Sequence, residues 1–261
     1  MVALDQIETG YEQRYDFAAP APRPTIAYLL ASVPRTGSTY FSHLLWATGC
    51  LGAPLEYLNF DAAGPYGFAH DRPDAQIALW HAAVAQRTSP NGVFGVKCFP
   101  GQLQWLQQRN MSLLADVFRT LLHRPPRRVI WLGRRDRSAH VISYARALLS
   151  GVWRWEQEEG GRPEPAFSGV ALARAERMLD ADERNWEKMF ADMAITPLRL
   201  WHEDVVADPE AATAAVARHL GVTLDPAARV AVPEIRKQSA EGARAWAEAA
   251  ARCGEADNPR S

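Results

Sequence analysis

Short apolar runs alternate with longer amphipathic segments along the chain. Residues 26–32 (IAYLLAS) are apolar on both faces, as the central strands of parallel sheets are. Similar runs predict further strands within residues 92–99, 127–136 and 195–205. The intervals between these runs are long enough for a helix in each connection, which is typical of βαβ units and a parallel sheet.

The segments between the strands carry helical periodicity. Residues 38–48 repeat apolar side chains at i, i+3, i+4 and i+7, and Gly49 follows as a helix terminator. Residues 59–74 predict a long surface loop because they are rich in glycine, proline and aromatics, and the charged residues 153–168 predict an irregular segment of the kind that forms lids. Further helices are predicted at residues 75–86, 111–123, 138–149, 171–194, 208–220 and 240–252.

This order of elements predicts an α/β fold, a P-loop-like three-layer sandwich with a central parallel sheet flanked by helices. Residues 25–261 are expected to form a single domain, and residues 1–24 an N-terminal arm or lead-in loop. In sheets of this kind, ligands bind beyond the carboxyl ends of the strands. Two of the predicted strands end there in basic turns, at residues 34–37 and 134–137.

Composition narrows the class of protein. A formal net charge of −1 over 261 residues gives no whole-chain attraction to nucleic acid or to an anionic membrane, so an anion site has to be local. Cys50, Cys98 and Cys253 are odd in number and show no paired spacing, which suits a reducing compartment. The N-terminus lacks the layout of a signal peptide, and no run reads as a membrane span. We therefore expect a soluble, cytoplasmic protein.

The first basic turn has the features of an anion-binding loop. Gly37 permits close approach of the backbone, the following helix presents free N–H groups, and Ser38, Thr39 and Arg35 add donors. The alternative is an ordinary polar helix cap. The ATP loop G-x-x-x-x-G-K-[ST] needs a lysine where this chain has Ser38, so a small-molecule kinase is disfavoured, although it stays an alternative.

The second basic turn adds another candidate anion site. Arg135 ends the strand at residues 127–136, and Ser143 follows eight residues later, about two turns into the next helix. Taken alone, the arginines at residues 134–137 could simply be a cluster of solvent-exposed charges at the end of a strand. Two such sites at the same edge of one sheet instead favour a ligand with phosphate-like groups at two ends.

The two turns together resemble the donor site of sulfotransferases, and the chain as a whole resembles the bacterial trehalose 2-sulfotransferase family. The similarity runs from about Ile26 onward and is carried by "SVPRTGSTYFSHLLWATGCLGAPLEYLN", "GVFGVKCF", "RRDRSAHVISYARALLSGVW", "NWEKMF…ITPLRLWHEDVVADP" and "RKQSAEGARAWAEAA". The resemblance implies that the donor is PAPS (3′-phosphoadenosine 5′-phosphosulfate) and the product PAP. It also implies that the loop Arg35, Thr36, Gly37, Ser38 and Thr39 holds the 5′-phosphosulfate, and that Arg135 and Ser143 hold the 3′-phosphate.

Sulfuryl transfer needs a base for the acceptor hydroxyl. In cytosolic sulfotransferases a histidine lies two residues beyond a strand lysine, but here Lys97 is followed at that spacing by Phe99. Glu56 lies in a Pro-x-Glu-Tyr motif like that of the trehalose enzymes, which implies that Glu56 is the base. A desolvated carboxylate at this place would have a raised pKa. The alternatives are that Glu56 caps a turn or pairs with an arginine.

Lys97 is the second catalytic candidate, because a buried lysine without a partner is costly and would have a role near the transferred group. The alternative is that the Lys97 side chain snorkels, so that its ammonium lies in solvent. His43, His140 and His202 show no ligand spacing, so no metal is expected. Arg236 and Lys237 could close over the 3′-phosphate, although an exposed pair of charges is the more ordinary interpretation.

The sequence thus predicts an enzyme that moves a sulfuryl group from PAPS to a hydroxyl of a carbohydrate or glycoside-like small molecule, by in-line attack with Glu56 as base. The acceptor is expected to contain sugar, with the aromatics of residues 59–80 and 152–155 suited to stacking on it. The family resemblance also implies a homodimer. A non-catalytic nucleotide-binding module is the remaining alternative.

Overall fold

A parallel sheet forms the centre of the molecule. The computed structural model describes residues 8–123, 125–155, 157, 163–236 and 240–256. Within these residues the sheet has four strands in the order β2-β1-β3-β4, and every neighbouring pair is parallel. The strands are β1 (Ile26–Ser32), β2 (Val93–Cys98), β3 (Arg128–Gly133) and β4 (Leu198–Trp201). The predicted α/β fold with a central parallel sheet is confirmed.

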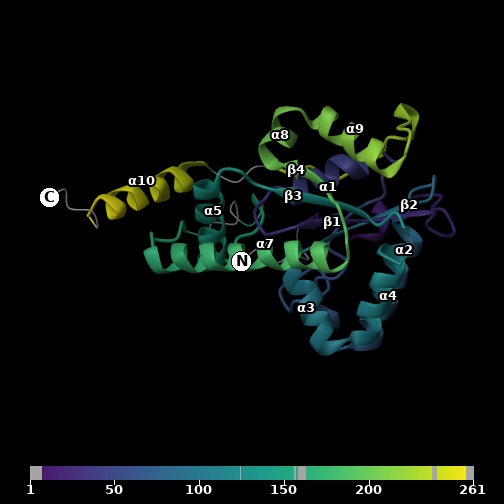
Figure 1. Cartoon of the computed structure of the whole chain (residues 1–261), viewed down its shortest axis with the longest axis horizontal. Coiled ribbons are helices and arrows are strands. Elements are labelled where there is room, and N and C mark those ends of the chain that lie inside the picture. Colours follow the sequence, from purple (N-terminus) through teal and green to yellow (C-terminus); the bar gives the residue numbers. More distant parts are fainter. Residues whose placement is uncertain (1–7, 124, 156, 158–162, 237–239, 257–261) are drawn as a thin grey trace.

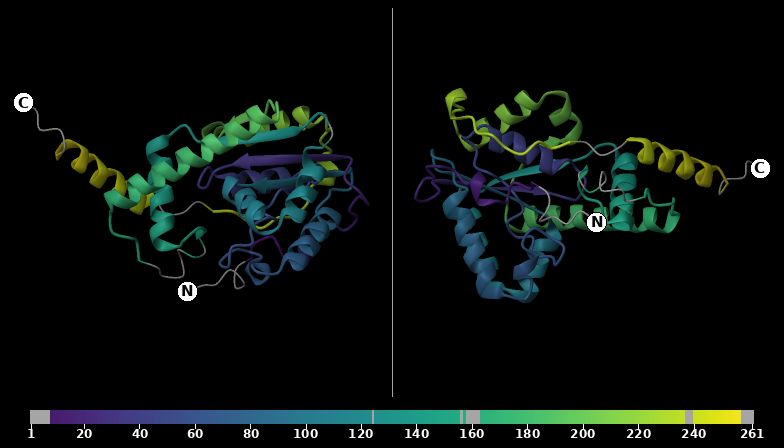
Figure 2. Two further views of the ribbon diagram at one scale, coloured as in Figure 1. Left: turned by 60° about the horizontal axis from the view of Figure 1, so that its bottom comes forward. Right: turned by 180° about the vertical axis from the view of Figure 1, so that it is seen from behind.

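Helices cover both faces of the sheet, which makes three layers (Figure 1). One face carries α1 (Ser38–Ala47), α8 (His202–Ala207) and α9 (Pro209–Leu220). The opposite side carries α2 (Pro73–Gln86), α3 (Pro100–Arg109), α4 (Met111–Leu121) and the long α7 (Gly169–Asp192). Helix α5 (Arg137–Ser150) packs on α7 beyond one end of the sheet, and α10 (Ala240–Ala256) extends outward from there (Figure 2).

Alternate side chains of β1 belong to two different cores. Tyr28 and Leu30 pack with Phe41 of α1 and Val216 of α9, and all of them are fully buried. Leu29 and Ala31 point to the other face, into the larger core that also contains the helices α2, α4, α5 and α7. A strand buried on both faces explains why its sequence is apolar throughout.

Two helices depart from the sequence prediction. Proline at the first position starts α3 directly after β2, in a place where no helix was expected. In residues 195–205 the strand is short, because His202 begins α8 with two acidic residues in its first turn, where the helix dipole favours negative charge. The loop predicted at residues 59–74 is present up to residue 72, with one 3₁₀ turn at Gly67–Ala69, and α2 begins at Pro73.

The N-terminal arm packs closely against the domain. Phe17 is 6% exposed and belongs to the larger core. The guanidinium of the buried Arg87 donates to the carbonyl oxygens of Gly10 and Glu12 and pairs with Asp16 at 2.7 Å. Residues 9–17 are therefore held on the folded body. Across the part of the chain that the structure describes, no helix combines the length and apolar character needed to cross a bilayer.

Candidate active site

The loop between β1 and α1 has the backbone of an anion site. Gly37 is the N-cap of α1 with φ 77°, and Arg35 also has a positive φ of 68°. Left-handed residues in a tight turn before a helix are typical of backbone nests that bind anions. A methyl group on Gly37 would lie 2.5 Å from Nδ1 of His202, so the imidazole at the start of α8 lies directly against the loop.

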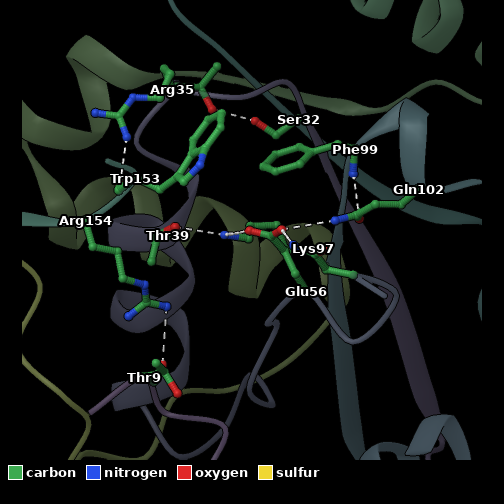
Figure 3. Close-up of polar contacts among 12 residues, drawn as sticks. Thr9, Ser32, Arg35, Thr39, Glu56, Lys97, Phe99, Gln102, Trp153 and Arg154 are labelled. Atoms are coloured by element: carbon green, nitrogen blue, oxygen red, sulfur yellow. Dashed lines mark hydrogen bonds and ion pairs between the residues drawn. The ribbon is translucent and has the colours of Figure 1, made fainter. Parts of the chain in front are cut away.

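The three hydroxyls of this loop lie in different surroundings. Thr36 is fully buried, and its Oγ1 donates to the carbonyl of Val33 at 3.1 Å and lies 2.6 Å from Oγ of Ser32, so this side chain stabilises the turn. Ser38 is 4% exposed in the first turn of α1. Thr39 Oγ1 accepts a hydrogen bond of 2.9 Å from Nζ of Lys97. Thr39 is thus the direct link between the loop and the second strand (Figure 3).

Arg35 connects the two predicted anion sites. Its Nε donates to Oγ of Ser143 in α5 at 3.0 Å, and its Nη1 donates to the carbonyl of Trp153 at 2.8 Å (Figure 3). The structure therefore brings Ser143 to the first basic turn, and the predicted pairing of Ser143 with Arg135 stays a prediction. The guanidinium that reaches Ser143 is that of Arg35.

Arg135 pairs with the first turn of α8. Both its terminal nitrogens donate to the Asp204 carboxylate, at 2.6 and 2.7 Å, and the guanidinium lies 5.1 Å from the ring centre of Trp201. Its backbone N–H and that of Asp136 donate to Glu203. The role of Arg135 at a 3′-phosphate stays a prediction.

Lys97 and Glu56 form a buried ion pair. Nζ of Lys97 lies 2.8 Å from Oε1 of Glu56, and the two side chains are 2% and 15% exposed. Lys97 therefore does not extend to solvent, and the ion-pair partner of Glu56 is this lysine and not an arginine. The ammonium of Lys97 links Glu56 to Thr39 (Figure 3). The ring of Phe99 lies beside the ammonium, at 5.6 Å from its centre.

The second carboxylate oxygen of Glu56 is also held. Oε2 accepts from the amides of Asn59 and Gln102, both at 3.0 Å. Gln102 at the start of α3 has a fixed orientation because its Oε1 accepts the backbone N–H of Phe99 at 3.1 Å, which leaves Nε2 to donate to Glu56. Three donors therefore orient this carboxylate before any acceptor arrives.

The pKa of Glu56 lies below its ordinary value, and the predicted rise is wrong. Burial raises this pKa, but the charge and hydrogen bond of Lys97, the hydrogen bond of Asn59 and the charge of Arg154 outweigh it. Burial lowers the pKa of Lys97, against the effect of Glu56. The carboxylate is therefore ionised at neutral pH and ready to accept a proton.

His43 and His140 each contact a backbone carbonyl through one ring nitrogen. His140 Nε2 lies 2.7 Å from the carbonyl of Pro34, and His43 Nδ1 lies 2.9 Å from that of Pro233. Burial first of all lowers the pKa of each imidazole, to about 4. In the described residues no group of three or more His, Cys, Asp and Glu could hold a metal ion.

The late basic segment is only partly described. Arg236 lies 4.6 Å from the ring centre of Trp155 and pairs with Glu234, while Lys237 lies outside the described residues. Closure of this pair over a 3′-phosphate stays a prediction. Of residues 153–168, the described part includes Trp153, whose carbonyl binds Arg35, and Arg154, which approaches Thr9 of the arm.

Sequence reasoning missed four side chains of this site: Tyr11, Asn59, Gln102 and Arg154. Asn59 lies in the quoted motif "GAPLEYLN", three residues after Glu56, and that spacing was the one usable signal. Tyr11 lies in the N-terminal arm, which was expected to lie outside the domain. Its hydroxyl accepts a hydrogen bond of 3.0 Å from the backbone N–H of Glu56. Nothing in the pattern of the chain marks Gln102 or Arg154.

Comparison with known proteins identifies the family of the chain. The family model for Stf0 sulphotransferase matches residues 27–252. The chain is 29% identical over 202 residues to a trehalose 2-sulfotransferase of Mycobacterium tuberculosis, with 66% of this chain and 75% of that protein covered. It is 28% identical over 209 residues to a trehalose 2-sulfotransferase of Mycolicibacterium smegmatis, again with 66% and 75% covered.

Among solved structures, a sulfotransferase domain from the curacin biosynthetic pathway is similar, at 18% identity and a TM-score of 0.45, covering 80% of this chain and 77% of that one. The family match spans most of the chain and includes both basic turns, the strand of Lys97 and the motif of Glu56. The chain therefore belongs to the Stf0 sulphotransferase family and is a sulfotransferase.

Proposed function

We propose that the protein transfers the sulfuryl group of PAPS to a hydroxyl of a carbohydrate or glycoside-like small molecule, with Glu56 as general base. One observation carries this proposal: Lys97 contacts Glu56 at 2.8 Å and the loop residue Thr39 at 2.9 Å. A candidate base and a candidate donor loop are thus joined by one buried cation. That arrangement suits a reaction in which a proton leaves on one side while negative charge develops on the other.

The donor would lie along the carboxyl edge of the sheet. In this proposal the backbone of residues 37–39, with Arg35, Thr36 and Ser38, holds the 5′-phosphosulfate, because the turn presents helix N–H groups and a guanidinium. Ser143 and Arg135 hold the 3′-phosphate. Arg135 would exchange Asp204 for the phosphate, and since both partners are about half exposed and screened by water, breaking that pair costs little.

The transfer step follows from the charges. The acceptor oxygen attacks sulfur in line, its O–S bond forms, and the bond between sulfur and the bridging oxygen of PAPS breaks. Glu56 takes the hydroxyl proton, and PAP leaves with the bonding electron pair on its 5′-phosphate oxygen. Lys97 shifts its charge from Glu56 toward this oxygen, which stabilises the leaving group and at the same time strengthens Glu56 as a base.

The acceptor class rests on the relatives. Both curated relatives are trehalose 2-sulfotransferases, so a sugar hydroxyl is the first acceptor to test. A kinase with a degenerate loop and a non-catalytic nucleotide-binding module remain the alternatives for the chemistry. The homodimer and the cytoplasmic location stay predictions.

Thermal-shift titration separates these alternatives. We expect PAP to stabilise the protein at lower concentration than ADP or Mg-ATP, because only PAP carries a phosphate on the 3′ position as well as on the 5′ position. A panel of hydroxylated compounds with PAPS, beginning with trehalose and read by mass gain, then identifies the acceptor. Preference for Mg-ATP would favour the kinase, and PAP binding without transfer to any acceptor would favour the binding module.

A further inference from the structure

The N-terminal arm contributes a rigid turn next to the candidate base. Glu12 accepts the backbone N–H groups of Thr9 and Gly10, at 2.8 and 2.7 Å, and so closes this turn. Arg87, which is 4% exposed, holds the outer side of the turn through the carbonyls of Gly10 and Glu12. A buried guanidinium that spends two of its donors on backbone oxygens fixes the position of the arm on the domain.

Tyr11 projects from this turn to Glu56. Its hydroxyl accepts the backbone N–H of Glu56 at 3.0 Å, and its ring packs edge-on against Tyr57 and Tyr66. Burial and the charge of Glu56 raise the pKa of Tyr11 well above its ordinary range, so the phenol keeps its proton. In the described part of the chain no group accepts that proton, which leaves a donor beside the base.

Two buried polar atoms near the turn lack partners among the described residues: Nη1 of Arg154 and Nε2 of His43. His43 is 4% exposed, and because its Nδ1 faces the carbonyl of Pro233, which can only accept, Nε2 is the unprotonated nitrogen. Arg154 therefore offers a buried donor and His43 a buried acceptor. Buried polar atoms without partners in a folded interior call for a ligand or an ordered group beside each of them.

The contacts of these side chains converge on the arm. Nη2 of Arg154 donates to the carbonyl of Thr9 at 3.5 Å, and Figure 3 shows its guanidinium on the Thr39 side of the Lys97–Glu56 pair. The ring of His43 lies 5.5 Å from that of Trp46. A methyl group on the neighbouring Gly10 would lie 3.0 Å from the Trp46 ring and 3.5 Å from Pro233. The electrostatic effect of Arg154 also reaches His43, Glu56 and Lys97.

The chemistry of these groups selects a ligand. Alcohol hydroxyls can both accept from Arg154 and donate to His43 Nε2, whereas a phosphate or carboxylate would have no proton for the imidazole. A second hydroxyl on the same molecule can accept from Tyr11 while a third faces Glu56. A compound with several closely spaced neutral hydroxyls meets all of these conditions.

We propose that residues 9–11 form the acceptor-side wall of the active site, where Arg154 binds a neutral polyhydroxyl acceptor and Tyr11 positions Glu56 toward it. This assignment rests on the proposed function and names residues through which the enzyme recognises its acceptor. It also makes the N-terminal arm part of the active site.

Calorimetric titration of the full-length protein tests the assignment in two stages. PAP is titrated first, as a report on the donor site alone, and trehalose or methyl α-glucoside is then titrated into the PAP-saturated protein. For Arg154→Met we expect binding of these neutral probes to weaken by about tenfold or more, since a charged hydrogen bond is lost, with PAP binding unchanged. Tyr11→Phe should weaken it less. Arg14→Met, an exposed arginine of the same arm, should change neither.

The outcomes are distinguishable. Neutral probes that bind Arg154→Met as they bind the wild type would overturn the assignment, as would a wild-type protein that binds PAP but neither probe. Tighter binding of glucose 6-phosphate than of trehalose would contradict a neutral subsite. Failure of PAP itself to bind the wild type would instead reject the proposed function. If Arg154→Met does not fold, Arg154→Gln carries the same expectation.

Discussion

At the scale of single residues, the site depends on one buried cation. Lys97 is 2% exposed, and its ammonium contacts both Glu56 and Thr39. It therefore offsets the negative charge of the candidate base and binds the candidate donor loop at the same time. Burying two charges is costly unless each is paired and hydrogen-bonded, and Glu56 has further donors in Asn59 and Gln102. The pair is therefore sensitive to the loss of either member.

Replacing Lys97 by Met should destabilise the protein and raise the pKa of Glu56. Loss of one partner from a buried pair typically costs about 3–5 kcal/mol, measurable by urea unfolding at neutral pH. With the cation gone, only the hydrogen bond of Asn59 and the charge of Arg154 still oppose the effect of burial, so the pKa of Glu56 rises. The acid limb of residual kcat/KM should therefore move to higher pH than in the wild type.

Lys188→Met is the matched control for this variant. Lys188 pairs with Asp192 on the surface of α7, with side chains 74% and 59% exposed, and its loss should cost at most about 0.5 kcal/mol. Equal stability losses in the two variants, or an acid limb that stays in place without Lys97, would show that Lys97 does not control the charge of Glu56.

Asp204→Asn should tighten PAP binding. Asp204 engages both terminal nitrogens of Arg135, and freeing that guanidinium makes it available to a 3′-phosphate without first breaking a pair. Because the pair is half exposed and screened by water, we expect only a small gain, at most roughly fivefold in the calorimetric Kd. Asp192→Asn removes a similar surface carboxylate and should leave Kd unchanged. Unchanged or weaker PAP binding by Asp204→Asn would place Arg135 outside the donor site.

At the scale of elements, the donor loop depends on the close approach of two chain segments. Gly37 has φ 77°, and the space that a side chain would fill is taken by His202 at the start of α8. The turn that feeds α1 is thus held against the turn that follows β4. The sequence predicts the first of these turns at the ligand-binding edge of the sheet, but its contact with His202 depends on a short strand and an early helix start that the apolar pattern does not reveal.

Gly37→Ala should therefore damage the donor site more than its size suggests. The left-handed backbone costs a non-glycine residue roughly 1–2 kcal/mol, and the new methyl group would also have to displace the His202 ring. We expect a lower Tm and weaker PAP binding. Gly101→Ala in α3 meets nothing within 4 Å and should be neutral or slightly stabilising. A Gly37→Ala protein with wild-type PAP affinity would contradict the role given to this turn.

Elements were predictable where one local pattern governs them. All four strands and most helices follow from periodicity, since burial of a strand or a helix face leaves a regular mark in the sequence. The partners of long side chains leave no such mark. Arg35 reaches Ser143 across 108 positions, and Arg87 holds the arm across more than 70, so neither contact could be read from spacing.

At the scale of the whole molecule, the chemistry gathers from segments far apart in the sequence. Side chains at one edge of the sheet come from the arm, the loop after β1, the end of β2, the middle of α5 and the segment after α5. The family match over residues 27–252 covers all of these except the arm.

The central claim is that Glu56 takes the acceptor proton while the residues around it hold the donor. Glu56→Gln keeps the size of the side chain but removes its basicity, so it is the most direct test. With the acceptor identified by the mass-gain screen, we predict that turnover of PAPS falls by roughly 10²–10⁴-fold, the usual contribution of a general base, while the calorimetric Kd for PAP is unchanged. Turnover close to that of the wild type, or loss of PAP binding together with activity, would contradict the account.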